Sequence, residues 1–378
     1  FRSRKDHGCS FGDAGITFID YLIHLDQGGV DSGRYASNYW TDLVAVLDKS
    51  LERINWLHQY VPHDAVASAK QARDLIARFN GNSRERQSHA CFDEALSVAT
   101  ILGTLADYRR LIRKSWSLRE MRFHFRLRES RLDFWPLFRR DWYDSMLGTH
   151  AMMNCLILNA VEKTLSQMKR QRMGVYIQEN QAWEMALNYA WRSAGHGPLV
   201  GVPHATVRYW DLRYFHDPRS YRRSGRNDLP LPDVVALNGP AAVAAYRSGS
   251  YPESQIVEVE ALRYLYLADL QGIGQTENRR PSRSPRVLVL GDYLPAATRR
   301  QMRLLSGAAA SLPSNTRYVM KPHPSCPVKA SEYPSLRLLA FSRPLAELLC
   351  ECDIAYASNI TSAAVDAYCA GVPVVSVL

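Results

Sequence analysis

Two short apolar runs near the C-terminus, each ending in a polar loop, constrain the fold of this chain most strongly. The first is Arg-Tyr-Val-Met (317–320), which leads into Lys-Pro-His-Pro (321–324). The second lies in residues 353–378 and carries a polar loop at 359–362. Short apolar runs bounded by turn residues are typical of buried strands in a parallel sheet. The pattern predicts an α/β fold whose polar loops lie beyond the carboxyl ends of the strands, where ligands bind in such sheets.

The residues at these two strand ends suit an anion, and they are Lys321, His323, Asn359, Thr361 and Ser362. The last two open a helix-like stretch that Gly371 closes in the position of a C-terminal cap. Backbone N–H groups and the helix dipole favour negative charge at such a start. The sequence therefore predicts a phosphate or nucleotide site. The simpler alternatives are a rigid turn at the two prolines and ordinary N-caps.

The pattern of strands and helices predicts two Rossmann-like domains with a cleft between them. With 378 residues and 46% hydrophobic residues, the chain is long enough for both. Strands are expected at 174–177, 199–202, 234–237 and 256–259, separated by helices, which implies a parallel sheet. The expected boundaries are an N-terminal acceptor-side domain at 1–273 with a helical region at about 38–170, a polar linker at 274–285, and a nucleotide-binding domain at 286–378. The sequence stops within a strand, so we expect the second sheet to continue after Leu378.

Positive charge is concentrated in one segment of the chain. The formal net charge is +10, and arginines are densest between Arg109 and Arg140, where they alternate with Phe, Leu and Trp. Three acidic residues in the same segment partly neutralise this charge, which favours a solvated helix face. Contact with anionic lipid headgroups is the second interpretation, because a basic segment with interleaved aromatic residues suits them. No RRM, KH or zinc-finger pattern is present, so nucleic acid is not the expected partner.

The cysteines and the hydropathy of the sequence indicate the cellular compartment of the protein. Seven cysteines are scattered without a CxxC pair or zinc-ligand spacing, which indicates reduced thiols. No run of about 18 apolar residues is present. We expect a cytoplasmic protein, with peripheral contact at the inner face of a membrane as a further option.

Several motifs together resemble those of the bacterial surface-carbohydrate biosynthesis proteins of capsule and lipopolysaccharide. They are Lys-Pro-His-Pro (321–324), the Ser/Thr loop before Ala-Gly-Val-Pro-Val (370–374), and the segments 176–184 and 201–215. That family is similar to the CMP-sugar-dependent sialyltransferases and Kdo transferases. The resemblance implies a GT-B-like fold with a helical insert in its N-terminal half. It also implies a glycosyltransferase that moves a sugar, Kdo or one like sialic acid, from a CMP-sugar to a glycan or glycolipid acceptor, without a further cofactor.

The resemblance also implies roles for individual residues. Lys321 and His323 would contact CMP or its phosphate, and Thr361 and Ser362 would bind phosphate oxygens. Gly291, at the end of the first strand of the second domain, would let the backbone approach the nucleotide closely.

Candidates for the acceptor side follow strands of the first domain, and they are Glu179, His204 and Asp211. A carboxylate there would act as nucleophile in a retaining enzyme, whereas a carboxylate or His204 would act as base in an inverting one. Each has a structural alternative: Glu179 as a helix cap with Glu184 as the important acid, His204 as a loop-ordering residue, and Asp211 in an ion pair with a neighbouring arginine. No DxD-like pair sits at a strand end, so we expect no essential metal.

The same sequence features are compatible with three other functions. A polyol-phosphate transferase and a nucleotide-sugar 2-epimerase share the two-domain layout. A basic nucleic-acid-binding protein is the alternative of another class.

Overall fold

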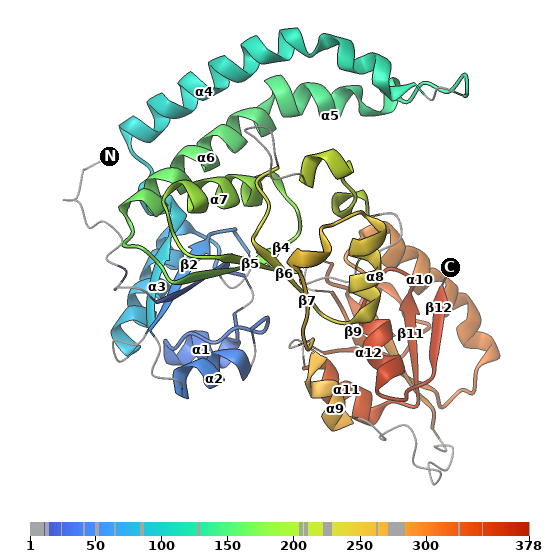
Figure 1. Cartoon of the computed structure of the whole chain (residues 1–378). Coiled ribbons are helices and arrows are strands. Elements are labelled where there is room, and N and C mark those ends of the chain that lie inside the picture. Colours follow the sequence, from blue (N-terminus) through green and yellow to red (C-terminus); the bar gives the residue numbers. More distant parts are fainter. Residues whose placement is uncertain are drawn as a thin grey trace. The chain divides into compact units, whose positions relative to one another are not determined.

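The chain folds into two compact units, Phe1–Leu262 and Arg263–Leu378. The computed structural model describes residues 11, 15–23, 25–40, 42–49, 53–63, 66–83, 87–126, 129–203, 207, 211–221, 229–261, 264–270, 284–323, 326–341 and 343–377 (Figure 1). The division between the units falls before the boundary predicted at residue 273. Most of the predicted linker, 274–285, lies outside the described residues.

Unit 1 is built on a seven-stranded parallel sheet with the strand order β3-β2-β1-β4-β5-β6-β7. The strands are β1 (Ile16–Tyr21), β2 (Ile54–Gln59), β3 (Gln87–Cys91), β4 (Met173–Gln178), β5 (Leu199–Pro203), β6 (Val234–Leu237) and β7 (Ile256–Glu258). The strand order reverses between β1 and β4, which makes their carboxyl ends the topological switch point of this sheet.

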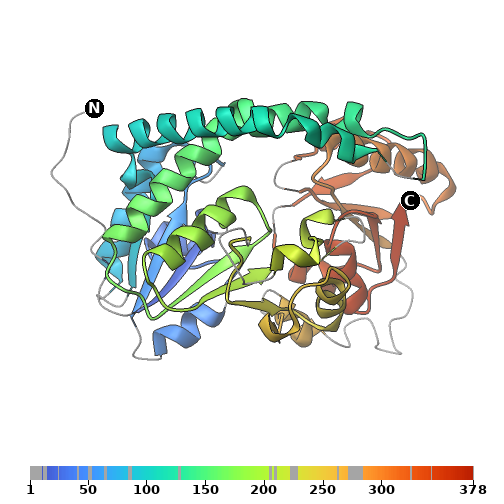
Figure 2. The same cartoon turned by 45° about the horizontal axis from the view of Figure 1, so that its top comes forward.

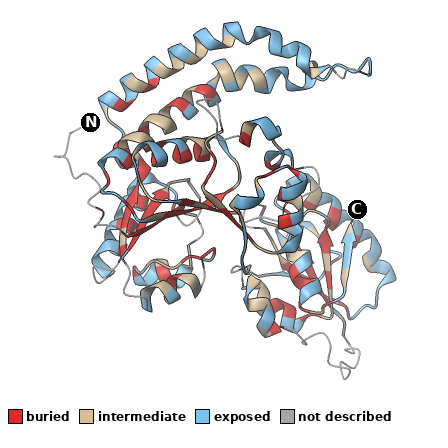
Figure 3. Ribbon diagram, viewed as in Figure 1, coloured by how far each residue is buried: buried red, intermediate tan, exposed pale blue. Residues whose placement is uncertain are grey.

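Helices cover both faces of this sheet. Successive side chains of each strand point to opposite sides, and the apolar side chains on both sides are buried by packing against helices. Ile19 and Leu57 pack under the α6 and α7 helices, whereas Phe18 and Trp56 pack with Trp40 on the other face. β1, β2, β3 and β4 are almost wholly buried, whereas the edge strand β7 is largely exposed (Figure 3). The helices are α1 (Gln27–Ser32), α2 (Asp42–Lys49), α3 (Ala69–Asn82), α4 (Val98–Ser117), α5 (Trp135–Leu147), α6 (Thr149–Gln167), α7 (Ala182–Ser193) and α8 (Pro240–Ser248), with short 3₁₀ turns η1 (Phe92–Ala95), η2 (Arg119–Phe125), η3 (Leu212–Tyr214), η4 (Pro218–Tyr221) and η5 (Glu253–Gln255).

The helical region predicted at about 38–170 was too broad. Two strands of the central sheet, β2 and β3, lie inside it, and the helical insert is confined to α4, η2, α5 and α6. Polar residues within β2 and β3 hid the strand pattern. Asn55 of β2, for example, is buried, and its amide donates to Gln171 Oε1 at 2.7 Å.

A buried polar chain crosses the first three strands and accounts for these polar positions. His58 Nδ1 lies 2.6 Å from Asp20 Oδ1, and His58 Nε2 lies 3.1 Å from His89 Nδ1. The other carboxylate oxygen of Asp20 accepts from Tyr35 (2.7 Å) and from the Trp40 indole (3.2 Å). Among the described residues His89 Nε2 has no hydrogen-bond partner, and burial together with the nearby His58 holds the pKa of His89 well below its ordinary value.

We predict that His89 makes unit 1 sensitive to acid. The folded state keeps this imidazole neutral, whereas the unfolded chain protonates it below about pH 6.5. Stability should therefore fall as the pH drops below that value, by at most about 1.4 kcal/mol per pH unit for one proton. Urea unfolding between pH 7 and pH 5 measures this slope. His89→Leu should flatten it, and parallel curves for the variant and the wild type would contradict the prediction.

Unit 2 has a five-stranded parallel sheet with the order β10-β9-β8-β11-β12. Its strands are β8 (Arg286–Leu290), β9 (Arg317–Lys321), β10 (Leu338–Ala340), β11 (Ile354–Ser358) and β12 (Val374–Val377). Its helices are α9 (Tyr266–Leu270), α10 (Pro295–Ala308), α11 (Leu345–Glu351) and α12 (Ala363–Cys369), with 3₁₀ turns η7 (Ala309–Ser311) and η8 (Ala330–Glu332). Here the strand order reverses between β8 and β11.

The start of unit 2 is fixed by α9, which the sequence pattern had assigned to the first domain. Leu270 packs in the same core cluster as Leu348 and Leu349 of α11. The Tyr266 hydroxyl donates to Asp366 Oδ2 at 2.9 Å.

The predicted fold class is confirmed. The chain is α/β, with two Rossmann-like units and a helical insert in the first. The six cysteines that the structure describes are free thiols.

Candidate functional site

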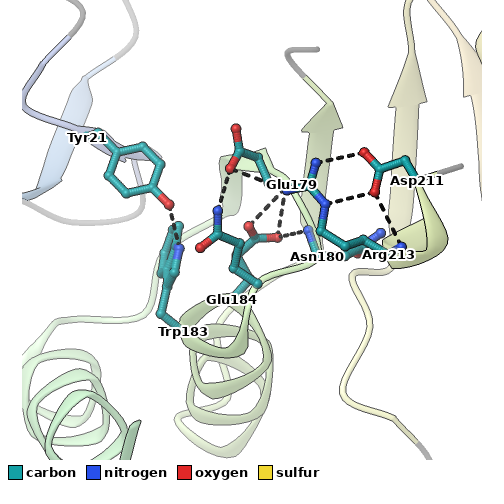
Figure 4. Close-up of polar contacts among 8 residues, drawn as sticks. Tyr21, Glu179, Asn180, Trp183, Glu184, Asp211 and Arg213 are labelled. Atoms are coloured by element: carbon teal, nitrogen blue, oxygen red, sulfur yellow. Dashed lines mark hydrogen bonds and ion pairs between the residues drawn. The ribbon is translucent and has the colours of Figure 1, made fainter. Parts of the chain in front are cut away.

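Polar side chains gather at the switch point of unit 1, beyond the carboxyl ends of β1 and β4 (Figure 4). Tyr21 is the last residue of β1, and Glu179 directly follows β4. The Tyr21 hydroxyl accepts a hydrogen bond from the Trp183 indole at 2.6 Å, and burial raises the pKa of Tyr21 strongly, so the phenol stays protonated. Open α/β sheets bind their ligands at this place.

Glu184 fixes the backbone conformation of the loop between β4 and α7. Its carboxylate accepts the backbone N–H of Glu179 (2.9 and 3.1 Å) and of Asn180 (2.9 Å), and Asn180 takes the left-handed conformation, with φ of 56°. Glu184 is buried, and burial raises its pKa to about 8 against the lowering effect of these N–H donors. The loop therefore presents Glu179 from a fixed backbone. Glu179 does not cap α7, because Gln181 occupies the N-cap position.

Two of the predicted acceptor-side carboxylates lie near one arginine. Arg213 donates to Asp211 through Nε (2.9 Å) and Nη2 (2.7 Å), and its Nη1 lies 3.8 Å from Glu179 Oε2. The Asp211 side chain also accepts from the Arg213 backbone, at the start of the η3 turn. Asp211 thus forms the ion pair that was its structural alternative, and this pair places the guanidinium beside Glu179. His204 lies outside the described residues.

The sequence did not lead us to Tyr21, and it suggested Glu184 only as an alternative to Glu179. Tyr21 ends its strand just as Glu179 follows β4, so the rule used for the strand ends would have found it. The burial of Glu184 and its bonds to the loop backbone depend on tertiary packing, for which the sequence gives no direct signal.

The second group of residues lies at the switch point of unit 2, where β8 and β11 end. Asp292 is buried and accepts a hydrogen bond from the Ser358 hydroxyl at the end of β11. Its other carboxylate oxygen accepts the backbone N–H of Leu294 at 2.8 Å. The carboxylate thus ties the loop after β8 to the end of β11.

Gly291 and the Lys-Pro-His loop approach each other closely, while the predicted approach of a nucleotide to Gly291 stays a prediction. The backbone N–H of Gly291 donates to the carbonyl of Lys321 at 2.9 Å. A Cβ at position 291 would lie 2.9 Å from the backbone nitrogen of His323 and 3.1 Å from Pro322 Cα. Only glycine fits between these two strand ends without moving backbone atoms.

The two basic residues of this loop differ in what they contact. The Lys321 amino group donates to the backbone carbonyl of Arg343 at 2.5 Å, and burial lowers its pKa. His323 is half-buried, its ring lies 6.1 Å from that of Tyr293, and burial lowers its pKa although Asp292 acts in the opposite direction. At neutral pH the His323 imidazole is therefore neutral and can donate one N–H.

The polar loop after β11 leads into a short helix. Asn359 and Ser362 are exposed, Thr361 is half-buried, and Ser362 takes the N-cap position without a side-chain capping bond. α12 has only seven residues, so its dipole is that of two turns. Gly371 ends it with φ of 77°, as its predicted role as a cap requires.

We predict that Gly291→Ala destabilises unit 2 by about 1–3 kcal/mol, because the added methyl meets backbone atoms that cannot rotate away. Gly307→Ala in α10 is the matched control, since a Cβ there has nothing within 4 Å. That substitution should stabilise by about 0.5–1 kcal/mol. Chemical denaturation of both variants measures the contrast, and equal stability would contradict the close approach.

Among the residues that the structure describes, no group of three or more His, Cys, Asp or Glu side chains is arranged to hold a metal ion. Independence of a metal stays a prediction.

Comparisons with known proteins concern the fold. No protein-family model and no curated protein matches the sequence. Among solved structures, the chain is similar to the UDP-GlcNAc 2-epimerase of Methanocaldococcus jannaschii, with 10% identity over 96% of this chain and 83% of that one and a TM-score of 0.49. It is also similar to HepE of Anabaena solved with UDP-glucose (12% identity, 96% and 79% covered, TM-score 0.44). MurG of Acinetobacter baumannii is a third (11% identity, 96% and 78% covered, TM-score 0.45).

Proposed function

We propose that this protein is a glycosyltransferase that moves a sugar from a nucleotide-sugar donor to a glycan or glycolipid acceptor. The observation that carries the proposal is the pair of polar groups, one at the switch point of each Rossmann-like sheet. Unit 1 contains the carboxylate of Glu179 beside Arg213. Unit 2 contains His323 and the hydroxyls of the loop after β11, close to Gly291, which has no side chain to block the backbone. A transferase of this kind needs both a group that activates the acceptor and a site that holds the departing nucleotide.

Unit 1 supplies the group that activates the acceptor. Glu179 takes the proton of the acceptor hydroxyl as its oxygen forms the new bond to the anomeric carbon. Glu184 acts as a positioning residue through the backbone of the loop, and the Arg213 guanidinium lies 3.8 Å from the Glu179 carboxylate.

Unit 2 supplies the nucleotide site. As the bond between the anomeric carbon and the phosphate oxygen breaks, the nucleotide leaves with the electron pair and gains negative charge. The neutral His323 donates a hydrogen bond to the phosphate, and the hydroxyls of Thr361 and Ser362 donate others. Lys321 shapes the loop by its bond to Arg343 and adds positive charge nearby.

The resemblance of the motifs to the surface-carbohydrate family favours a CMP-sugar, with Kdo or a sugar like sialic acid. In an inverting reaction Glu179 is the base, and in a retaining one it is the nucleophile, so the anomeric configuration of the product distinguishes the two.

Product analysis tests the proposal. The intact chain is incubated with a CMP-sugar, CDP-glycerol or UDP-N-acetylglucosamine, with and without a glycan acceptor. Release of CMP together with a glycosylated acceptor supports it. Consumption of CDP-glycerol would make the protein a polyol-phosphate transferase, and acceptor-independent conversion of UDP-N-acetylglucosamine would make it an epimerase.

A further inference from the structure

Residues 98–147, here called the helical arm, form a segment of unit 1 with almost no buried side chains. The arm comprises α4, η2 and α5 (Figure 2), and neither η2 nor α5 has a buried residue. α4 buries only Thr100 and Thr104. Helices in proteins owe most of their stability to the packing of an apolar face. The outer part of the arm has little such packing within the described part of the chain.

The base of the arm is nevertheless fixed to the body of unit 1. Asn159 of α6 donates to Asp107 Oδ2 at 2.8 Å, and Lys163 donates to Ser97 Oγ at 2.9 Å. α6 itself packs into the core through Val161 and Leu165. The arm is therefore a helical hairpin held at its base and exposed along its length.

Apolar side chains lie on the exposed surface of the arm in a regular pattern. Val98, Leu102, Leu105 and Trp116 recur at spacings that place them on one side of α4, and Trp116 is 71% exposed. In the outer part, Leu137 is 72% exposed and Leu132 is 59% exposed. The members of this exposed set are Val98, Ile101, Leu102, Leu105, Trp116, Leu118, Met121, Phe123, Leu132, Phe134, Leu137, Phe138, Tyr143 and Leu147.

Aromatic rings cluster where η2 meets α5. The Phe125 ring lies 5.4 Å from that of Trp135 and 5.6 Å from that of Phe138. The guanidinium of Arg122 lies over the Phe123 ring at 4.7 Å. Of these rings, Trp135 combines an apolar body with a polar N–H, and such amphipathic rings favour an interface between water and an apolar phase.

Half of the net charge of the protein lies on the same segment. Residues 98–147 contain eleven basic residues and six acidic ones, a net charge of +5 out of +10 for the whole chain. One of those acids, Asp133, is already paired with Arg126. The surface to which the arm binds must therefore be negatively charged as well as apolar.

These properties together fit one occupant best. A second copy of the arm would bring two strongly positive segments together, which is unfavourable. Nucleic acid would satisfy the arginines, but it offers little apolar surface to the exposed leucines and valine. An anionic bilayer supplies headgroup charge and an acyl boundary at the same place.

We propose that the helical arm docks on the surface of an anionic lipid bilayer. The arginines contact the headgroups, and Trp116, Leu132 and Leu137 enter the boundary between headgroups and acyl chains. Within the described residues, no helix is long and apolar enough to span a membrane, and the proposed contact is peripheral.

Vesicle flotation of the full chain tests the proposal. Vesicles of phosphatidylcholine alone are compared with vesicles containing an equal part of phosphatidylglycerol. We expect binding to the anionic vesicles only, weakening as salt is added. Arg119→Glu, Arg122→Glu and Arg139→Glu combined should weaken it by about 100-fold or more, since each arginine near the surface accounts for roughly a fivefold change. The matched control reverses three exposed arginines of α10 in unit 2, Arg299, Arg300 and Arg303, and should bind as the wild type does.

A second variant separates charge from apolar contact. Trp116→Ser, Leu132→Ser and Leu137→Ser combined should keep the charge and the fold, because all three side chains are exposed, yet lose the part of the binding that survives salt. Absence of flotation with anionic vesicles, or equal loss in the α10 control, would overturn the proposal. Binding of single-stranded RNA that the arm variants abolish, without vesicle binding, would make the arm a nucleic-acid surface. A dimer that the serine variant dissociates, again without vesicle binding, would make it a self-association surface.

Discussion

Glu179→Gln is expected to lower turnover by about 100-fold to 10,000-fold, as the loss of a general base typically does. The substitution keeps the shape of the side chain but removes the group that accepts a proton. Glu179 follows β4 at the switch point of unit 1 and is held by a loop whose backbone is bonded to Glu184. Steady-state rates with a saturating donor measure the effect, while nucleotide affinity and melting temperature should stay close to those of the wild type.

Matched controls make this test specific. Glu253→Gln changes an exposed glutamate that pairs with Arg247, and it should leave turnover unchanged. Asp211→Asn weakens the Arg213 pair, so it should lower turnover through Glu179. Asp217→Asn provides its control, because the Asp217–Arg219 pair has nearly the same geometry (2.8 and 2.7 Å) at an exposed position. Normal turnover of both Glu179→Gln and Asp211→Asn would show that these residues have only structural roles.

His323→Ala is expected to weaken nucleotide binding by about 10-fold to 150-fold, which corresponds to the loss of one hydrogen bond to a charged phosphate at about 1.5–3 kcal/mol. His323 is half-buried in a loop and belongs to no core cluster among the described residues. Its removal should therefore change the melting temperature little. Calorimetric titration of CMP into both proteins measures the difference.

His323→Asn is the informative partner variant, because an amide still donates one N–H and should recover part of the affinity. A large fall in melting temperature of His323→Ala with unchanged nucleotide binding would show that the ring only supports its loop.

The sequence allowed prediction of those strands that are apolar throughout. Residues 174–177, 199–202 and 234–237 are apolar runs between turn residues, and each is a strand in the structure. β2 and β3 escaped prediction because His58 and His89 replace apolar residues in them. The hydrogen bonds of His58 to Asp20 and to His89 form only when three strands have come together, so hydrophobic periodicity does not reveal this arrangement.

The candidate site was predictable to the extent that parallel topology determines it. Glu179 and Asp211 follow different strands, and the shared edge of the sheet led us to expect them near each other, as Arg213 places them. The bond from Lys321 to the carbonyl of Arg343 could not be predicted, because it depends on the path of a distant loop. The burial of Glu184 depends equally on tertiary packing, since helix pattern alone does not tell a buried acid from an exposed one.

The most direct test of the proposed function is an assay of the wild-type chain for nucleotide release from CMP-, UDP- and GDP-sugars, with the acceptor product identified by mass spectrometry. The panel includes UDP-glucose. The account predicts that a CMP-sugar releases CMP in step with a glycosylated acceptor, and that Glu179→Gln abolishes this release while CMP still stabilises the protein against heat. Failure of every nucleotide to stabilise the wild type, together with no transfer from any donor, would contradict it.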